Sequence, residues 1–235
     1  MDHKKHFAMR LLGYILVVLV IMFSGILIGR AQPQEFAGIS EQQKFLKSHG
    51  FLVGDENAFE YYQEAITFLN SQNITKEYIK GVKPGDPLFI EAKERLLPLF
   101  YQGAKQREMK IPEPGYWHEV IEYNGKQIKV SDIYTLCYGF LLKSLKHSAD
   151  TDSPDLGYIC LAFGTQLSKY YGHEVLYGSG IALKYAALEW LIAYHEREKN
   201  PQELSTVTDL FENVKNEFEM FKKQLKNKKW WHYWR

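Results

Sequence analysis

Histidines followed by glutamates are the first residues in this chain whose types could do chemistry. His173-Glu174 and His195-Glu196 suggest a metal site, because a zinc-binding helix of hydrolytic enzymes carries two His residues four positions apart with a Glu between them. Neither pair is followed by the second His that this pattern requires. We therefore interpret both pairs as ordinary polar residues of an exposed or core-edge helix face.

The segment Gly178-Ser179-Gly180 has some features of the turn that exposes a nucleophilic serine in many hydrolases. That turn requires a Gly two residues before the Ser and a strand leading into it, whereas Tyr177 occupies the position concerned. The glycines more simply separate two helices, and we predict that Ser179 caps the second helix.

Paired carboxylates, Glu56 with Glu60 and Glu212 with Glu219, are the remaining candidates for catalysis. Two carboxylates can hydrolyse a glycosidic bond, but nothing in this spacing distinguishes them from helix surface. The chain also lacks a phosphate-binding glycine loop and a dinucleotide fingerprint. We predict no catalytic residue, no metal and no cofactor. The alternative is a cell-envelope hydrolase whose site is assembled from dispersed residues.

Two cysteines, Cys137 and Cys160, fall on the apolar faces of consecutive predicted helices. Outside the cytoplasm they could form a disulfide, whereas a buried free Cys packs like a small apolar residue. In a regular antiparallel pair turning near Thr151, their axial offset is about 7.5 Å at 1.5 Å per residue. Bridged Cα atoms usually lie within about 7 Å, so this geometry slightly disfavours the bond.

The C-terminal end is the most unusual part of the sequence, because aromatic and basic residues alternate there without any acid. Trp and Tyr prefer the membrane–water interface, and Lys adds attraction to anionic lipids. The alternative is that the rings simply pack on the domain. The candidate residues for contact with a membrane or a partner are Lys228, Lys229, Trp230, Trp231, Tyr233 and Trp234.

An uncharged run from Leu11 to Gly29 predicts a transmembrane helix. Its length at helical rise is roughly 28 Å, close to the ~30 Å hydrocarbon thickness of a bilayer. A cleaved signal peptide and a buried core helix are the alternatives. The first usually has a shorter apolar region and a small-residue cleavage site, which Gly29-Arg30-Ala31 matches poorly.

Basic residues set the expected orientation of this span. Lys4, Lys5 and Arg10 precede it, whereas Arg30 alone follows closely, and Lys and Arg favour the cytoplasmic side. We therefore expect a single-pass membrane protein with a cytoplasmic N-terminus and a domain outside the cytoplasm, in the periplasm if the membrane is a bacterial inner membrane. The predicted organisation is a tail at 1–10, a span at 11–29, a linker at 30–39, a helical domain at 40–229 and the aromatic and basic tail at 230–235.

The composition predicts a folded domain without a general attraction to nucleic acid. The 235 residues are 46% hydrophobic and 15% aromatic, and the formal net charge is +1. Aromatics at this level exclude disorder over most of the chain, and a near-neutral charge gives no global pull toward polyanions. We expect no nucleic-acid partner.

Apolar residues recur at helical spacing through most of the chain, which predicts an all-α fold, a bundle or a set of helical hairpins. Asn124-Gly125 favours one small β-hairpin near 119–130, with Ile121 opposite Ile128. Pro98 predicts a kink or a break in its helix. The predicted helices cover 40–48, 55–70, 86–108, 131–147, 155–171, 179–199 and 201–229.

The last of these helices, 201–229, carries an apolar seam of heptad type over about three repeats. It either docks on the domain or mediates self-association as a coiled coil. Together these patterns favour a non-enzymatic, membrane-anchored helical module that binds a protein partner or a membrane surface, with the lipid bilayer contacted through Leu11–Gly29.

Overall fold

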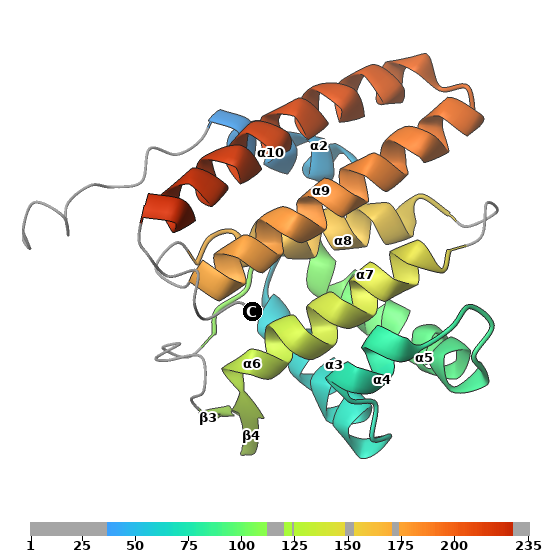
Figure 1. Ribbon diagram of the computed structural model, residues 1–235, viewed down its shortest axis with the longest axis vertical. Helices are drawn as coiled ribbons and strands as arrows, with labels where there is room; N and C mark the ends of the chain where they lie inside the picture. The colour runs from blue at the N-terminus through green and yellow to red at the C-terminus, as the bar shows by residue number, and fades with distance from the viewer. Residues whose placement is uncertain (1–36, 112–119, 124, 149–152, 171–173, 228–235) are drawn as a thin grey trace, which may run out of the picture. The chain divides into compact units, whose positions relative to one another are not determined.

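The computed structural model describes residues 37–111, 120–123, 125–148, 153–170 and 174–227 (Figure 1). Most of these residues are helical, which confirms the prediction of an all-α fold. The helices, in chain order, are α2 (Ala37–Ser48), α3 (Ala58–Ser71), α4 (Lys76–Gly81), α5 (Pro87–Lys105), α6 (Val130–Asp132), η1 (Ile133–Tyr138), α7 (Gly139–Lys146), α8 (Asp155–Leu167), α9 (Glu174–Arg197) and α10 (Pro201–Asn227).

Besides the helices, the described residues contain four short strands that form two pairs. The antiparallel pair β3 (Val120–Tyr123) and β4 (Lys126–Lys129) confirms the predicted hairpin, with Ile121 opposite Ile128 as expected. The other pair was not expected: β1 (Gly54–Asn57) runs parallel to β2 (Gln106–Glu108). The predicted helix start at Asp55 is therefore wrong, because this residue lies in β1 and the side chain of Asn57 caps α3 instead.

Within the described part of the chain, no helix is both long enough and apolar enough to cross a membrane. The predicted span Leu11–Gly29 lies outside the described residues, as do the tail at 1–10 and most of the linker.

Helices α3, α5 and α8 meet in an aromatic core that contains one network of buried hydrogen bonds. Tyr62 of α3 stacks edge-on against Phe163 of α8, with ring centroids 4.6 Å apart. Its hydroxyl donates to Gln166 at 2.6 Å, and the amide of Gln166 donates in turn to the carbonyls of Gly103 and Gln106 at 3.0 and 2.7 Å. Because buried polar groups are costly when unpaired, this network fixes how α3, α5 and α8 meet.

Helices α8 and α9 approach so closely that their backbones touch. A Cβ atom added to Gly164 would lie 2.8 Å from the carbonyl oxygen of Gly180, and one added to Gly180 would lie 2.7 Å from that of Gly164. The prediction that the glycines around Ser179 separate two helices is therefore wrong. Helix α9 begins at Glu174, so these glycines lie inside it and serve its contact with α8.

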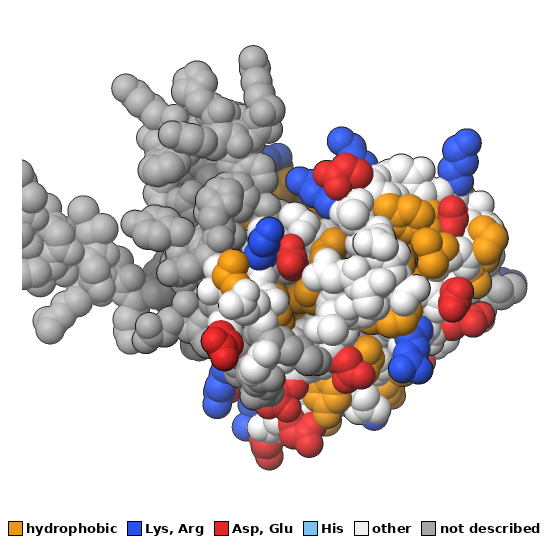
Figure 2. Space-filling model, turned by 90° about the horizontal axis from the view of Figure 1, so that it is seen from below, with side chains coloured by type: hydrophobic (Ala, Val, Ile, Leu, Met, Phe, Trp, Pro, Cys, Tyr) orange, Lys and Arg blue, Asp and Glu red, His pale blue; other side chains and the backbone are white. Residues whose placement is uncertain are grey.

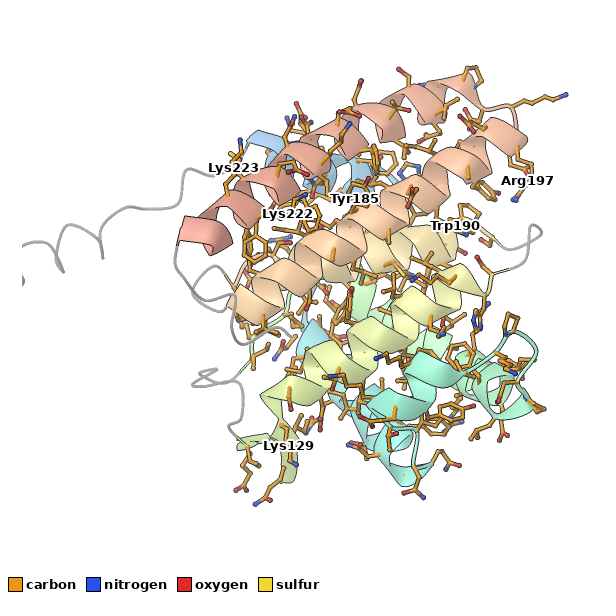
Figure 3. All side chains as sticks on the ribbon, viewed as in Figure 1. Lys129, Tyr185, Trp190, Arg197, Lys222 and Lys223 are labelled. Carbon is orange, nitrogen blue, oxygen red and sulfur yellow. The ribbon has the colours of Figure 1, made fainter. Side chains whose placement is uncertain are left out.

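Helix α10 lies antiparallel to α9 along most of its length (Figure 1). Figure 3 shows Tyr185 of α9 directed toward α10, where its ring centroid lies 4.7 Å from that of Phe211 and 6.0 Å from that of Phe218. Val207 and Val214 of the predicted seam are fully buried. The apolar stripe of α10 thus packs on this chain's own helices, and self-association through it would require α10 to leave α9.

Two helices depart from the expected geometry. Helix α5 runs as one element through Pro98, which is exposed, so the break considered at that residue does not occur. The predicted helix at 131–147 contains a π-helical stretch, η1, before α7 begins. Such π-helical turns are rare and are often found at functional sites.

Candidate functional site

A groove of about 290 Å³ lies between α4 and the helical run formed by η1 and α7. Its floor is apolar and its two walls carry lysines. The lining residues are Ile79, Thr135, Tyr138, Gly139 and Leu142 together with the four lysines Lys76, Lys80, Lys143 and Lys146. None of these described lining residues is acidic, so the groove combines an apolar surface with unopposed positive charge.

The spacing of these lysines follows directly from their helices. Lys76 and Lys80 are four residues apart on α4, and Lys143 and Lys146 are three apart on α7, so each pair lies on one helix face. The ammonium of Lys143 donates to the carbonyl of Lys80 at 3.1 Å, which ties α7 to the C-terminal end of α4. Positive charge at a helix C-terminus is favourable, because the carbonyl dipoles point there.

Hydrogen bonds around Asp86 hold α4 in position. The carboxylate of Asp86 accepts from the hydroxyl of Tyr78 at 2.6 Å and from the backbone of Phe89 at 3.1 Å, so it connects α4 to the start of α5. These bonds lower the pKa of Asp86, whereas burial and the same bond to Asp86 raise the pKa of Tyr78 to about 12. The side chain of Thr75 caps the first turn of α4. The α4 wall is therefore positioned by the protein's own hydrogen bonds.

The histidine that follows α7, His147, has a lowered pKa. Burial, followed by the nearby charges of Lys143 and Lys93, lowers the pKa of His147. This environment favours the neutral imidazole, whereas a neighbouring carboxylate would favour the charged imidazolium. Burial is the larger cause of this shift, and the two lysine charges add to it.

Apart from its lysines, the described lining of this groove carries two hydroxyl groups, those of Thr135 and Tyr138, and no carboxylate, histidine or cysteine. The hydroxyl of Thr135 donates to the carbonyl of Ser131 at 2.8 Å, within its own helical run. Ammonium groups beside an apolar floor can bind a carboxylate, phosphate or sulfonate attached to an apolar group. The arrangement suits binding of an anionic amphipathic ligand.

A second hollow, of about 320 Å³, lies beside β1 and β2. Two of its three acids are paired with cations: Arg107 lies 3.3 Å from Asp55, and Lys110 lies 3.2 Å from Glu108, whereas Glu56 accepts a hydrogen bond from the hydroxyl of Tyr61. Exposed pairs of this kind contribute little to stability, and Glu56 leaves the lining with one net negative charge, which does not favour an anion. Figure 2, which views the molecule from the end where α3 to α5 lie, likewise shows apolar atoms interrupted by side chains of both signs.

His195, which the sequence offered as a metal ligand, is a buried residue of the α9 face toward α8. Its Nε2 lies 3.3 Å from the hydroxyl of Tyr158, and burial lowers its pKa. The ring of His49, the residue that follows α2, lies 4.5 Å from the ring of Tyr158, and its Nε2 lies 3.5 Å from Glu203. Over the residues that the structure describes, no three His, Cys, Asp or Glu side chains are arranged to hold a metal ion.

The carboxylates considered for catalysis lie on helix or strand surfaces. Glu212 pairs with Lys215 and Glu219 pairs with Lys222, each three residues along α10. Glu56 accepts a hydrogen bond from the hydroxyl of Tyr61. Glu56 lines the hollow beside β1 and β2, whereas Glu60, Glu212 and Glu219 line neither described hollow, so neither predicted pair lies together in one of them.

The most deeply buried charges form an ion pair between α9 and α10. The ammonium of Lys184, which is fully buried, lies 2.6 Å from Glu217, whose other carboxylate oxygen accepts from the hydroxyl of Tyr177 at 3.2 Å. Burial lowers the pKa of Lys184, and the adjacent carboxylate opposes that shift. Neither residue lines either of the two described hollows, and we interpret the pair as a structural contact.

Cys137 and Cys160 are both buried and both free in the structure. Their thiols donate to different carbonyls, those of Tyr62 and Leu141, at 3.9 Å each. Mass spectrometry of unreduced protein is the measurement that tests the disulfide considered from the sequence. The tail residues Lys228, Lys229, Trp230, Trp231, Tyr233 and Trp234 lie outside the described residues.

The groove was not predicted from the sequence. The pairs Lys76/Lys80 and Lys143/Lys146 have a spacing that places each pair on one helix face, which is a visible signal. Such pairs are common on solvated helices, however, and nothing local indicates that two segments 63 residues apart will face each other.

Comparisons with protein-family models, with curated proteins and with solved structures each found no significant match to this chain.

Proposed function

We propose that this chain is a membrane-anchored, non-enzymatic binding module whose helical domain lies outside the cytoplasm and captures an anionic partner in the groove between α4 and α7. The observation that carries the proposal is the groove itself, with lysines on both walls, an apolar floor and no acid among its described lining residues. A site of this composition can bind by charge and apolar contact, and its described lining has no carboxylate, histidine or cysteine to serve as a base or nucleophile.

Binding at this groove is expected to be reversible and sensitive to salt. Exposed charges contribute about 0–1 kcal/mol each and are screened over a distance of roughly 8 Å at physiological ionic strength. The floor adds apolar burial, which salt does not screen. A ligand that offers an anion alone would bind weakly, and one that also offers an apolar group would bind better.

The anchor is part of the proposal and rests on the uncharged run Leu11–Gly29 with its basic N-terminal flank. Protease added to cells with a permeable outer layer should digest the helical domain and leave the span protected. If the domain stays intact until the inner membrane is lysed, the orientation is wrong.

The binding function can be tested with a probe that combines an anion with apolar rings. Full-length protein in zwitterionic detergent micelles should enhance the fluorescence of anilinonaphthalene sulfonate above the level of micelles alone, and added salt should reduce this enhancement. The double variant K80E/K146E should lose most of the protein-dependent signal.

The matched control is K44E/K223E, which makes the same change in net charge at lysines of α2 and α10. Figure 3 shows Lys223 on α10, far from α4. Equal loss in the two double variants would show that the probe responds only to net charge and would refute the groove as a binding site.

A further inference from the structure

One residue of the groove floor, Gly139, has no structural reason to be glycine. Its backbone is helical, with φ −60° and ψ −43°, so the position does not need the left-handed freedom of glycine. An added Cβ would meet nothing closer than the Cγ2 atom of Ile79 at 3.5 Å, which is an ordinary contact.

Five other helical glycines differ from Gly139 in this respect, whereas Gly81, the last residue of α4, has room for a Cβ atom as Gly139 does. At each of the five an added Cβ would lie under 3.0 Å from a neighbouring atom, so the fold itself requires the missing side chain. These glycines are Gly103, Gly157, Gly164, Gly178 and Gly180.

Glycine in a helix interior is less favourable than alanine by about 1 kcal/mol. Gly139 therefore lowers the stability of its helix by this amount, although no neighbouring group of the described fold occupies the position of its missing Cβ. Gly139 lines the groove between the two rows of lysines, and its added Cβ would contact Ile79 there. Glycine at such a position permits another backbone to approach closely.

We infer that the groove receives an amphipathic helix of a partner protein, whose backbone crosses the floor above Gly139, whose apolar residues contact Ile79 and Leu142, and whose acidic residues face the lysines on both walls. This inference rests on the proposed function and names its ligand class. Laying an apolar helix face in a groove is an established mode of recognition between proteins.

The spacing of the lysines along each wall matches the spacing of side chains on one face of a partner helix. Along their helix axes, Lys76 and Lys80 are about 6 Å apart and Lys143 and Lys146 are about 4.5 Å apart, at 1.5 Å per residue. Carboxylates three or four residues apart on the partner would have the same separations. One turn of acidic residues on each side of an apolar ridge therefore matches the four ammonium groups.

A bilayer surface fits these features less well. A membrane is flat on this scale and can reach lysines at a rim, but it does not enter a recess between two helices. The groove volume of about 290 Å³ is near the lower end of ordinary ligand sites, so it holds a few side chains. A missing Cβ on the floor gives no advantage to a headgroup that stays at the rim.

The test uses full-length protein in nanodiscs of zwitterionic lipid and a labelled synthetic helix. The probe carries Leu at helical positions i, i+3, i+4 and i+7 with Glu on both flanks, and fluorescence anisotropy measures its binding. Gly139→Ala should raise the Kd about tenfold, because the added methyl group would hold the apolar face of the synthetic helix away from the groove floor. K80E/K146E should raise it at least as much, because two attractions become repulsions.

Gly81→Ala is the matched control for the glycine variant. Gly81 ends α4 beside the groove, it does not line the groove, and an added Cβ there meets nothing within 4 Å. This variant should bind the helix as the unaltered protein does. Thermal melting of Gly139→Ala should show no loss of stability, which separates a binding defect from a folding defect.

Each outcome is decisive. Equal affinity of Gly139→Ala and unaltered protein for the helix overturns the inference. If the helix does not bind while anilinonaphthalene sulfonate still does, the groove is a binding site and the inferred partner is wrong. If anionic vesicles bind, the helix does not, and K80E/K146E abolishes vesicle binding, the partner is a membrane surface. If neither the helix nor the small anion binds, the proposed function fails as well.

Discussion

Replacing Glu217 by Leu isolates the energy of the buried ion pair between α9 and α10. The substitution leaves Lys184 with no exposed surface and removes the carboxylate that lies 2.6 Å from its ammonium. It also removes the acceptor of the Tyr177 hydroxyl. Unfolding should therefore become much easier, because a buried charge that loses its partner is strongly unfavourable.

The expected loss follows from the burial of both groups. Breaking a buried pair by removing one partner costs about 3–5 kcal/mol. For a domain of 150 to 250 residues, each kcal/mol shifts the melting temperature by about 2–4 °C, so E217L should lower it by about 6–20 °C. In the double variant K184M/E217L both charges are absent, and most of this loss should be recovered.

The loss should also depend on pH in a defined direction. Burial lowers the pKa of Lys184, and removing the opposing carboxylate lowers it further. The unfolded chain then binds a proton that the folded E217L protein gives up, so the stability of this variant should rise with pH up to the ordinary lysine pKa. The unaltered protein should show a smaller rise over the same range.

Thermal melting of the full-length protein in mild detergent, followed by far-UV circular dichroism, measures these effects. The control is Lys215→Ala, which removes an exposed pair with Glu212 at 3.0 Å on the same helix and should change the free energy of unfolding by about 1 kcal/mol or less. Melting of E217L within about 2 °C of the unaltered protein would refute the reasoning, since the loss of one partner from a buried ion pair should shift the melting temperature several-fold more. A double variant as unstable as E217L would refute it too.

Three further predictions concern the interior. Gly164→Ala should lower the free energy of unfolding by about 1–3 kcal/mol in urea titrations, because the new methyl group would lie 2.8 Å from the carbonyl oxygen of Gly180 and force α8 from α9. Burial lowers the pKa of His195, so the unfolded chain takes up a proton first as the pH falls through about 6.5; the melting temperature should drop below that pH, and His195→Gln should reduce the drop. Burial raises the pKa of both Cys137 and Cys160, so a thiol reagent should label neither in the folded protein and both after denaturation, and rapid labelling of the folded protein would contradict their burial.

Features set by nearby residues could be predicted from the sequence. The hairpin is an example, because a Gly at the turn is needed where the backbone takes positive φ, and Gly125 has φ +71°. Most helices were also predicted, because their apolar stripes have a helical period. The helix start at Asp86 is another success, since this residue caps α5 through its own side chain.

Features set by distant partners could not be predicted in the same way. Gly178 and Gly180 were interpreted as helix breakers, but their role depends on Phe221 and Gly164, which lie opposite them in space. The parallel pairing of β1 with β2 depends on the side chain of Gln106, whose oxygen accepts from the backbone of Glu56 at 3.1 Å. The groove likewise depends on which helix packs beside α4.

The position of α2 has a consequence for the order in which the protein is completed during synthesis. This helix begins the described domain, yet it packs on α8 and on α10, and Asn213 of α10 donates to Glu41 of α2 at 3.0 Å across 172 residues of chain. Contacts between such distant segments form only after both have left the ribosome. The first helix of the described domain to emerge is therefore among the last to gain its full set of neighbours. In a nascent chain that ends before α10, the face of α2 that contacts α10 is exposed to solvent. Quality-control proteases and chaperones could therefore bind this face in every truncated product.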